Sequence, residues 1–226
     1  MPLVRKEGKT KAVRAPRADG EATRARILEA AGELFAASGF VETTSKAIAA
    51  RAGADMASIN YHFGSRDGLY QAVLVEAHRR LLDLADLQRF AQSALPAADK
   101  LRMLIDKLIQ RATEGGTGWD LTVIAAEALA PSSHFQVLFE LEVPMKASVV
   151  LSILEDITGI PVDDPALLRC LFSVVTPCVA LLIGRRGIPG PIQEVQRMPR
   201  EVIVEHLHRF AMAGLEAIGS EYARNR

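Results

Sequence analysis

The stretch from Thr44 to Tyr70, TSKAIAARAGADMASINYHFGSRDGLY, decides the fold. Hydroxyl side chains at its start can cap a short helix, and Gly53 is suited to end that helix about two turns later. Asp55 then takes the N-cap position of another short helix, which is expected to run from Met56 to His62. Two short helices joined by a few residues with a glycine in the turn form a helix-turn-helix unit.

A longer helix is expected before this unit. Thr23 occupies its N-cap position, and Gly39 is placed to end it in a left-handed conformation. The apolar residues between them form a one-sided stripe: Ile27, Leu28, Ala31, Leu34 and Phe35. Residues 21–67 are therefore predicted to form an N-terminal three-helix domain, whose last helix is placed to enter the major groove of DNA.

These residues resemble a known family. The strings TSKAIA at 44–49, SINYHF at 58–63 and SRDGLY at 65–70 closely resemble the DNA-binding domain of TetR-type transcription regulators. The Asn-Tyr-His-Phe ending is most like the CecR-like branch, and residues 119–159 are similar to the ligand-binding domain of that branch. The sequence departs from the pattern at Asp55, where many relatives have serine, and at Gly68, where glycine costs about 1 kcal/mol of helix stability.

The resemblance implies roles in DNA binding for nine residues. Five match positions that touch phosphate and carry suitable donors: Thr44, Ser45, Tyr61, His62 and Arg66. Lys46 can reach either a phosphate or a base edge. Three match positions that read bases: Ala57, Ser58 and Asn60. The alternatives are structural, since Tyr61 can be a core aromatic and His62 an ordinary surface histidine, and Phe63 is expected in the core.

Positive charge is concentrated near the N-terminus. The whole chain has 27 Lys and Arg against 27 Asp and Glu, but residues 1–66 hold 11 against 7, a net charge of +4. Residues 1–20 are basic and have almost no large apolar side chains, so a disordered arm is expected there. Such an arm can add salt-dependent affinity for DNA, and a merely solvated tail is the alternative.

Beyond residue 67 the chain is expected to be entirely helical. Glycine and proline clusters divide the whole sequence into about nine or ten helices, and no run shows the period-two alternation of a strand. The sequence therefore predicts an all-α protein in which residues 68–226 form a C-terminal helical domain for ligand binding and dimerisation.

The most apolar segment runs from Cys170 to Gly184. Its fifteen uncharged residues are too few to span a bilayer and are bounded by arginines, so a buried helix is favoured over a membrane span. The apolar h-region of a signal peptide is absent, and a cytoplasmic location without membrane contact is expected.

The last helix is expected from about Arg200 to Tyr222. It carries one apolar stripe: Val202, Ile203, Leu207, Phe210, Ala211, Gly214, Leu215 and Ile218. In TetR-like proteins the last two helices form a four-helix dimer interface, so the resemblance implies a homodimer here. Packing within one chain is the alternative interpretation.

Six residues of the C-terminal domain are candidates for the wall of a small-molecule site. They combine aromatic surface with a few polar groups: Trp119, Glu127, Phe135, Phe139, Phe172 and Thr176. Each can instead be an ordinary core residue. The Glu127 carboxylate can be paired, exposed or in contact with a ligand.

Enzyme chemistry finds no support in the sequence. The five histidines lack the H-E-x-x-H spacing, no glycine-rich phosphate loop or G-x-S-x-G elbow occurs, and neither a metal site nor a cofactor is expected. Cys170 and Cys178 lie about 12 Å apart along one expected helix, too far for a disulfide, and are expected to be reduced.

We therefore expect a transcription regulator that binds specific double-stranded operator DNA. The resemblance favours a repressor that a small hydrophobic ligand releases from a palindromic operator. A protein that binds DNA without sequence preference is the first alternative, and a helical enzyme or lipid carrier is the second.

Overall fold

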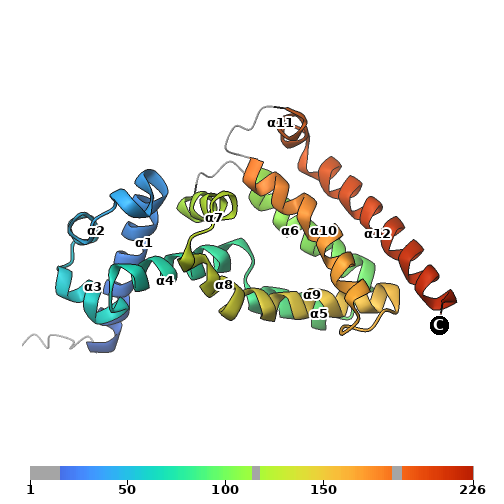
Figure 1. Ribbon diagram of the computed structural model, residues 1–226, viewed down its shortest axis with the longest axis horizontal. Coiled ribbons are helices and arrows are strands. Elements are labelled where there is room, and N and C mark those ends of the chain that lie inside the picture. The colour runs from blue at the N-terminus through green and yellow to red at the C-terminus, as the bar shows by residue number, and fades with distance from the viewer. Residues whose placement is uncertain (1–15, 114–117, 185–189, 226) are drawn as a thin grey trace, which may run out of the picture.

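The structure, a computed structural model, describes residues 16–113, 118–184 and 190–225 (Figure 1). These residues form twelve α-helices, one short 3-10 helix and no strand, which confirms the all-α class. The helices outnumber the nine or ten expected, because short ones such as α8 (Gln136–Leu141) and α11 (Pro191–Gln196) lie between the longer ones.

The first four helices are α1 (Pro16–Glu42), α2 (Ser45–Ala52), α3 (Met56–Phe63) and α4 (Arg66–Leu81). Local capping sets the ends of the two short ones. The Thr44 side chain accepts from the Ala47 backbone N–H, and the Asp55 side chain accepts from that of Ser58 at 2.7 Å. Gly53 closes α2 in a left-handed conformation with φ 58°. The predicted helix-turn-helix unit is confirmed.

The start of α1 differs from the prediction. The helix begins at Pro16, so residues 16–20 are helical although they were expected in the disordered arm; the rest of that arm lies outside the described residues. Thr23 therefore lies inside the helix and is not its N-cap. Its hydroxyl donates to the Asp19 carbonyl one turn earlier. A proline in the first turn needs no N–H partner, which allows the earlier start. Gly39 does interrupt the helix, with φ 75° and ψ 171°.

The remaining helices build the body of the protein. They are α5 (Leu84–Gln92), α6 (Ala97–Thr113), α7 (Trp119–Leu129), the 3-10 helix η1 (Ser133–Phe135), α8, α9 (Val143–Thr158), α10 (Pro165–Gly184), α11 and α12 (Arg200–Arg224). In Figure 1, α1–α3 form one end of the molecule, α4 leads from them into the body, and α12 lies along the opposite edge.

Two hydrophobic cores stabilise this arrangement. The head core contains buried residues of α1–α4 together with Trp119 and Val123 of α7. The body core is built mainly from α6, α9, α10 and α12. Helix α4 supplies Leu69 and Leu74 to the head core and Leu81 to the body core. One continuous helix therefore connects the two cores.

Helix α10 is long and apolar enough to cross a membrane by length and composition alone, with a mean hydropathy of 2.2. A core helix of a soluble protein can pass the same test. In this protein one side of α10, including Leu167, Cys170 and Val174, is buried in the body core. Its other side leaves Leu168 and Phe172 exposed, so α10 is less fully covered than the sequence predicted.

Gly68 has a steric explanation in the structure. A Cβ atom at this position would lie 2.2 Å from the carbonyl oxygen of Phe63. We expect Gly68→Ala to lower the free energy of unfolding by about 1–3 kcal/mol, although alanine is the better helix former. Urea unfolding measures the change. Gly20→Ala is the control, because a Cβ there meets only His62 at 4.0 Å, and equal behaviour of the two variants would contradict the steric explanation.

Candidate DNA-binding surface and ligand cavity

Helix α3 presents a distinct exposed face. Ala57, Asn60 and Tyr61 are exposed, and 85% of the Tyr61 surface is accessible, so Tyr61 is not a core aromatic. Ile59 on the opposite face is buried in the head core. Phe63 is half-buried against this core, as expected. The exposed face therefore holds two of the expected base-reading residues beside a tyrosine hydroxyl.

The other expected DNA-binding residues lie between the N-cap of α2 and the first turn of α4. Thr44 and Lys46 at the start of α2 are exposed, and four more are half-buried: Ser45, Ser58, His62 and Arg66. The Asp55 carboxylate caps α3, and hydrogen bonding from Ser58 lowers the pKa of Asp55. The anion that departs from the family pattern thus has a structural role at the helix N-terminus.

Arg66 has internal contacts that the sequence did not reveal. Its Nη1 donates to the Thr43 carbonyl at 2.9 Å, and its guanidinium lies 4.3 Å from the centroid of the Phe40 ring. These contacts connect the first turn of α4 to the end of α1 and to the segment that follows it. A structural role therefore accompanies the phosphate contact that the resemblance implies for Arg66.

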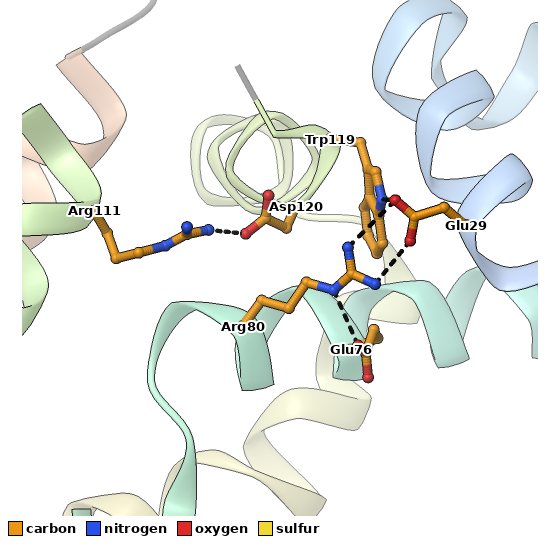
Figure 2. A network of polar contacts seen from close by, with 6 residues as sticks. All are labelled: Glu29, Glu76, Arg80, Arg111, Trp119 and Asp120. Atoms are coloured by element: carbon orange, nitrogen blue, oxygen red, sulfur yellow. Dashed lines mark hydrogen bonds and ion pairs between the residues drawn. The ribbon is translucent and has the colours of Figure 1, made fainter. Parts of the chain in front are cut away.

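A polar network joins the head to the body (Figure 2). The indole Nε1 of Trp119 on α7 donates to Glu29 of α1 at 2.8 Å. Arg80 of α4 donates to Glu29 at 2.7 Å and to Glu76 at 3.0 Å, and its guanidinium lies 4.6 Å from the Trp119 ring centroid. An ion pair between Arg111 and Asp120 lies on the other side of α7.

Trp119 was expected in a ligand site, but it lines neither of the two apolar cavities described below. Its side chain is buried in the head core, against α1. The approach is close enough that a Cβ on Gly32 would lie 2.3 Å from the indole ring. Packing between α1 and α7, a contact between segments distant in the sequence, occupies the aromatic surface expected to meet a ligand.

Glu127 is likewise a buried, paired carboxylate, and it lines neither of these two cavities. It is buried, and accepts from the Tyr70 hydroxyl at 2.7 Å and from the backbone N–H and hydroxyl of Ser132 at 2.8 and 2.9 Å. Burial, and then this carboxylate, raise the pKa of the Tyr70 hydroxyl. The paired alternative considered for Glu127 is the one that the structure supports.

A cavity of about 520 Å³ lies between the last turn of α4 and helices α6, α8, α9 and α10. Its walls include three of the six expected residues: Phe139, Phe172 and Thr176. Phe135 lines a smaller neighbouring cavity of about 160 Å³, which shares His78, Leu81 and Val179 with the larger one. Apolar side chains dominate the larger cavity, and its size suits a small molecule.

One wall of the larger cavity carries a polar cluster that the sequence analysis missed. Lys146 is buried, and its Nζ lies 2.9 Å from His78 Nδ1, 3.2 Å from the His78 carbonyl and 3.1 Å from Glu142. Arg79 donates to the other oxygen of Glu142 at 3.0 Å. The spacing of Glu142 and Lys146, one helical turn apart, was the available sequence signal.

The environment of this cluster shifts its pKa values. Burial, followed by the charge of Lys146, lowers the pKa of His78 to about 4. Burial also lowers the pKa of Lys146, against the attraction of Glu142. Burial alone would raise the pKa of Glu142, but hydrogen bonds from Lys146 and Arg79 outweigh it and lower this pKa. His78 is therefore neutral near neutral pH, and the Lys146 ammonium is placed 3.1 Å from the Glu142 carboxylate.

The depressed pKa of His78 predicts a loss of stability in acid. The unfolded chain takes up this proton near pH 6.5, whereas the folded protein resists it down to about pH 4. The contribution of His78 to the free energy of unfolding is therefore complete above about pH 6.5 and decreases as the pH falls toward 4. At pH 5 the decrease is about 2 kcal/mol. Urea unfolding at pH 7.5 and 5 should show a smaller decrease for His78→Gln, which does not titrate. Equal decreases in both proteins would contradict the assignment.

Both cysteines are buried and free. Burial raises the pKa of both thiols, to about 12 for Cys178. They are therefore poor nucleophiles at neutral pH.

Sequence comparison identifies two regions. Residues 27–73 match the family described as bacterial regulatory proteins, tetR family, and residues 97–218 match the C-terminal domain of the HTH-type transcriptional dual regulator CecR. The second match alone covers more than half of the chain. No curated protein matches the sequence significantly.

Solved structures share the fold. A TetR-like transcriptional regulator from Rhodococcus sp. RHA1 has a TM-score of 0.64 at 19% identity, covering 89% of this chain and 98% of its own. The fatty acid degradation regulator FadR from Bacillus halodurans has a TM-score of 0.65 at 13% identity, with coverages of 84% and 98%. The TetR family regulator PfmR from Thermus thermophilus has a TM-score of 0.57 at 19% identity, covering 83% of this chain and 97% of its own.

The matched helix-turn-helix head and the matched C-terminal domain are the two parts that the structure shows as α1–α4 and the helical body. The chain therefore belongs to the TetR family of transcription regulators and carries a C-terminal domain of the CecR type.

Proposed function

We propose that this regulator is a repressor that binds a palindromic operator as a homodimer and is released by a small hydrophobic ligand. The observation that carries the proposal is the position of α4, which contacts the DNA-reading helix at one end and the 520 Å³ cavity at the other. We assign the protein to the cytoplasm, where its operator would be.

The exposed face of α3 supports base reading. Asn60 can form a bidentate pair with adenine, and Ala57 can contact a thymine methyl group. Lys46 of α2 and Tyr61 of α3 are both exposed and carry donors suited to phosphate. We propose that the nine residues implied by the family resemblance bind DNA. Arg66 also holds the first turn of α4 in place through its contacts with Thr43 and Phe40.

The exposed apolar residues of α12, together with two on α10, support a homodimer. Val202, Phe210 and Ile218 on α12 are 52%, 74% and 40% exposed. Leu168 and Phe172 on α10 are 54% and 69% exposed, and they also line the 520 Å³ cavity. A Cβ on Gly214 would meet nothing within 4 Å, so this part of α12 leaves room for a second helix to approach. A twofold dimer through these helices would present two copies of α3 to successive half-sites.

The geometry of α4 offers a route from ligand to DNA. His78 and Leu81 in its last turns line the cavity, and Arg66 in its first turn contacts the segment before α2. A ligand that prefers one position of α4 would bias the spacing of the two reading helices. Linked sites of this kind typically have a coupling of about 1–3 kcal/mol.

Asn60→Ala tests base reading. We expect it to cost about 1–3 kcal/mol at one position of each half-site and to relax the base preference there, because a bidentate contact is lost. Duplexes selected from a random pool identify the operator, and titrations with single-base variants then measure the preference. Gln88→Ala, an exposed residue of α5, is the control.

The same selection tests the proposal as a whole. Enrichment of inverted repeats supports a dimeric operator-binding protein. Equal binding to all duplexes would indicate a nonspecific DNA-binding protein, and selection of unsymmetric sites by a monomer would contradict the palindromic operator.

A further inference from the structure

The larger cavity has few polar groups. Apolar side chains of α6, α9 and α10 form most of its wall, and the polar side chains that line it are His78, Lys146 and Thr176. A bound molecule must therefore be largely apolar, and the available hydrogen-bond partners determine which polar group it can carry.

Lys146 has no donor left for a ligand. An ammonium group has three hydrogens, and three acceptors surround this Nζ: His78 Nδ1, the His78 carbonyl and the Glu142 carboxylate. All three distances are 3.2 Å or less. The buried cation is thus satisfied by the protein itself.

The same contacts fix the tautomer of His78. Since the ammonium can only donate, Nδ1 must accept, and the ring proton is therefore on Nε2. His78 lies in the wall of both cavities, and among the described residues no protein group accepts from Nε2. His78 thus offers a neutral N–H donor with a fixed orientation.

The local charges are balanced. Lys146 and Arg79 both contact the Glu142 carboxylate, and the charges of Arg79 and Asp83 also act on Lys146. A ligand carboxylate would lose its water without gaining a free cationic donor, and a ligand ammonium would be buried near Lys146. Burial of either unpaired charge is unfavourable.

We propose that the effector is an uncharged, largely apolar molecule with a hydrogen-bond acceptor such as a ketone, ester or amide carbonyl, and that His78 Nε2 donates to this acceptor. The inference rests on the proposed function in taking the 520 Å³ cavity as the effector site. It further assigns Lys146 and Glu142 as positioning residues, which hold the imidazole in the donating tautomer.

Three ligands of equal chain length test the chemistry: 2-decanone, decanoate and decylammonium. Each is titrated against the full-length protein without DNA, by displacement of the uncharged fluorescent probe N-phenyl-1-naphthylamine. We expect 2-decanone to bind at least about tenfold more tightly than either ion. Tighter binding of decanoate or decylammonium, or no binding of 2-decanone, would overturn the proposal.

Two variants test the role of His78. His78→Leu should weaken the binding of 2-decanone by about tenfold, which is the effect of losing one buried hydrogen bond. The affinity for the fluorescent probe should stay within about threefold of that of the unchanged protein. His78→Gln keeps an acceptor for Lys146 and an N–H donor, so it should retain most of the affinity for 2-decanone. Equal weakening of probe and ketone in His78→Leu would indicate a structural role only and would overturn the proposal.

Operator titrations separate this inference from the proposed function. If 2-decanone shows the expected binding pattern but leaves operator affinity unchanged, the ligand chemistry holds and ligand-controlled release fails. If operator release occurs with decanoate and not with 2-decanone, regulation holds and the uncharged effector class is wrong.

Discussion

Phe210→Asp should convert the protein from a dimer into a monomer and weaken operator binding by more than about a hundredfold. Phe210 is 74% exposed in a single chain and lies in the middle of α12, on the face proposed as the dimer interface. Twofold symmetry places each substitution in the interface twice, so two carboxylates would be buried among apolar groups. A monomer can then occupy only one half-site, and the affinity contributed by the second head is lost.

Sedimentation velocity and operator titration measure the two effects on the same preparations. Gln88→Asp is the matched control, because it places the same negative charge on an exposed position of α5. It should remain dimeric and bind the operator normally. A Phe210→Asp variant that stays dimeric, or a monomer with full operator affinity, would show that α10 and α12 do not form the functional interface.

Trp119→Ala should lower the free energy of unfolding by about 3–5 kcal/mol, the usual cost of removing a large buried aromatic side chain. The indole is 6% exposed and packs closely against Gly32, so its removal leaves a void between α1 and α7. In a chain of this length the melting temperature should fall by roughly 10 °C. The Glu29 carboxylate also loses the indole N–H and keeps Arg80.

Trp119→Phe serves as the comparison for this variant. It keeps an aromatic ring but removes the donor to Glu29, and should cost less than Trp119→Ala. Displacement of N-phenyl-1-naphthylamine by a cavity ligand should be unchanged in both variants at a temperature where they remain folded. A small loss of stability together with a large loss of ligand affinity would instead place Trp119 in the ligand site, as the sequence first suggested.

Local sequence signals predicted the head well. The caps at Thr44 and Asp55 and the left-handed Gly53 depend on residues within one turn, and their chemistry is readable from the chain itself. The start of α1 at Pro16 was missed, because a short basic segment with few large apolar residues indicates disorder by composition.

Roles set by distant contacts were less predictable. An aromatic residue such as Trp119 or Phe172 suits either a core or a ligand wall, and only the packing of the helices separates the two. Phe139, Phe172 and Thr176 do line the cavity. The polar wall was missed because His78 and Lys146 are 68 positions apart and meet only when α4 packs against α9.

Trp119 is the only tryptophan in the chain, and it lies at the contact between head and body. The emission of an indole depends on the polarity of its surroundings and on nearby charges. Here the Glu29 carboxylate accepts from the indole N–H, and the Arg80 guanidinium lies over the indole ring. Intrinsic fluorescence excited at the tryptophan band therefore comes from this one junction. Any shift in wavelength or intensity on adding operator or ligand would report movement between α1, α4 and α7, in the native protein and without an attached dye.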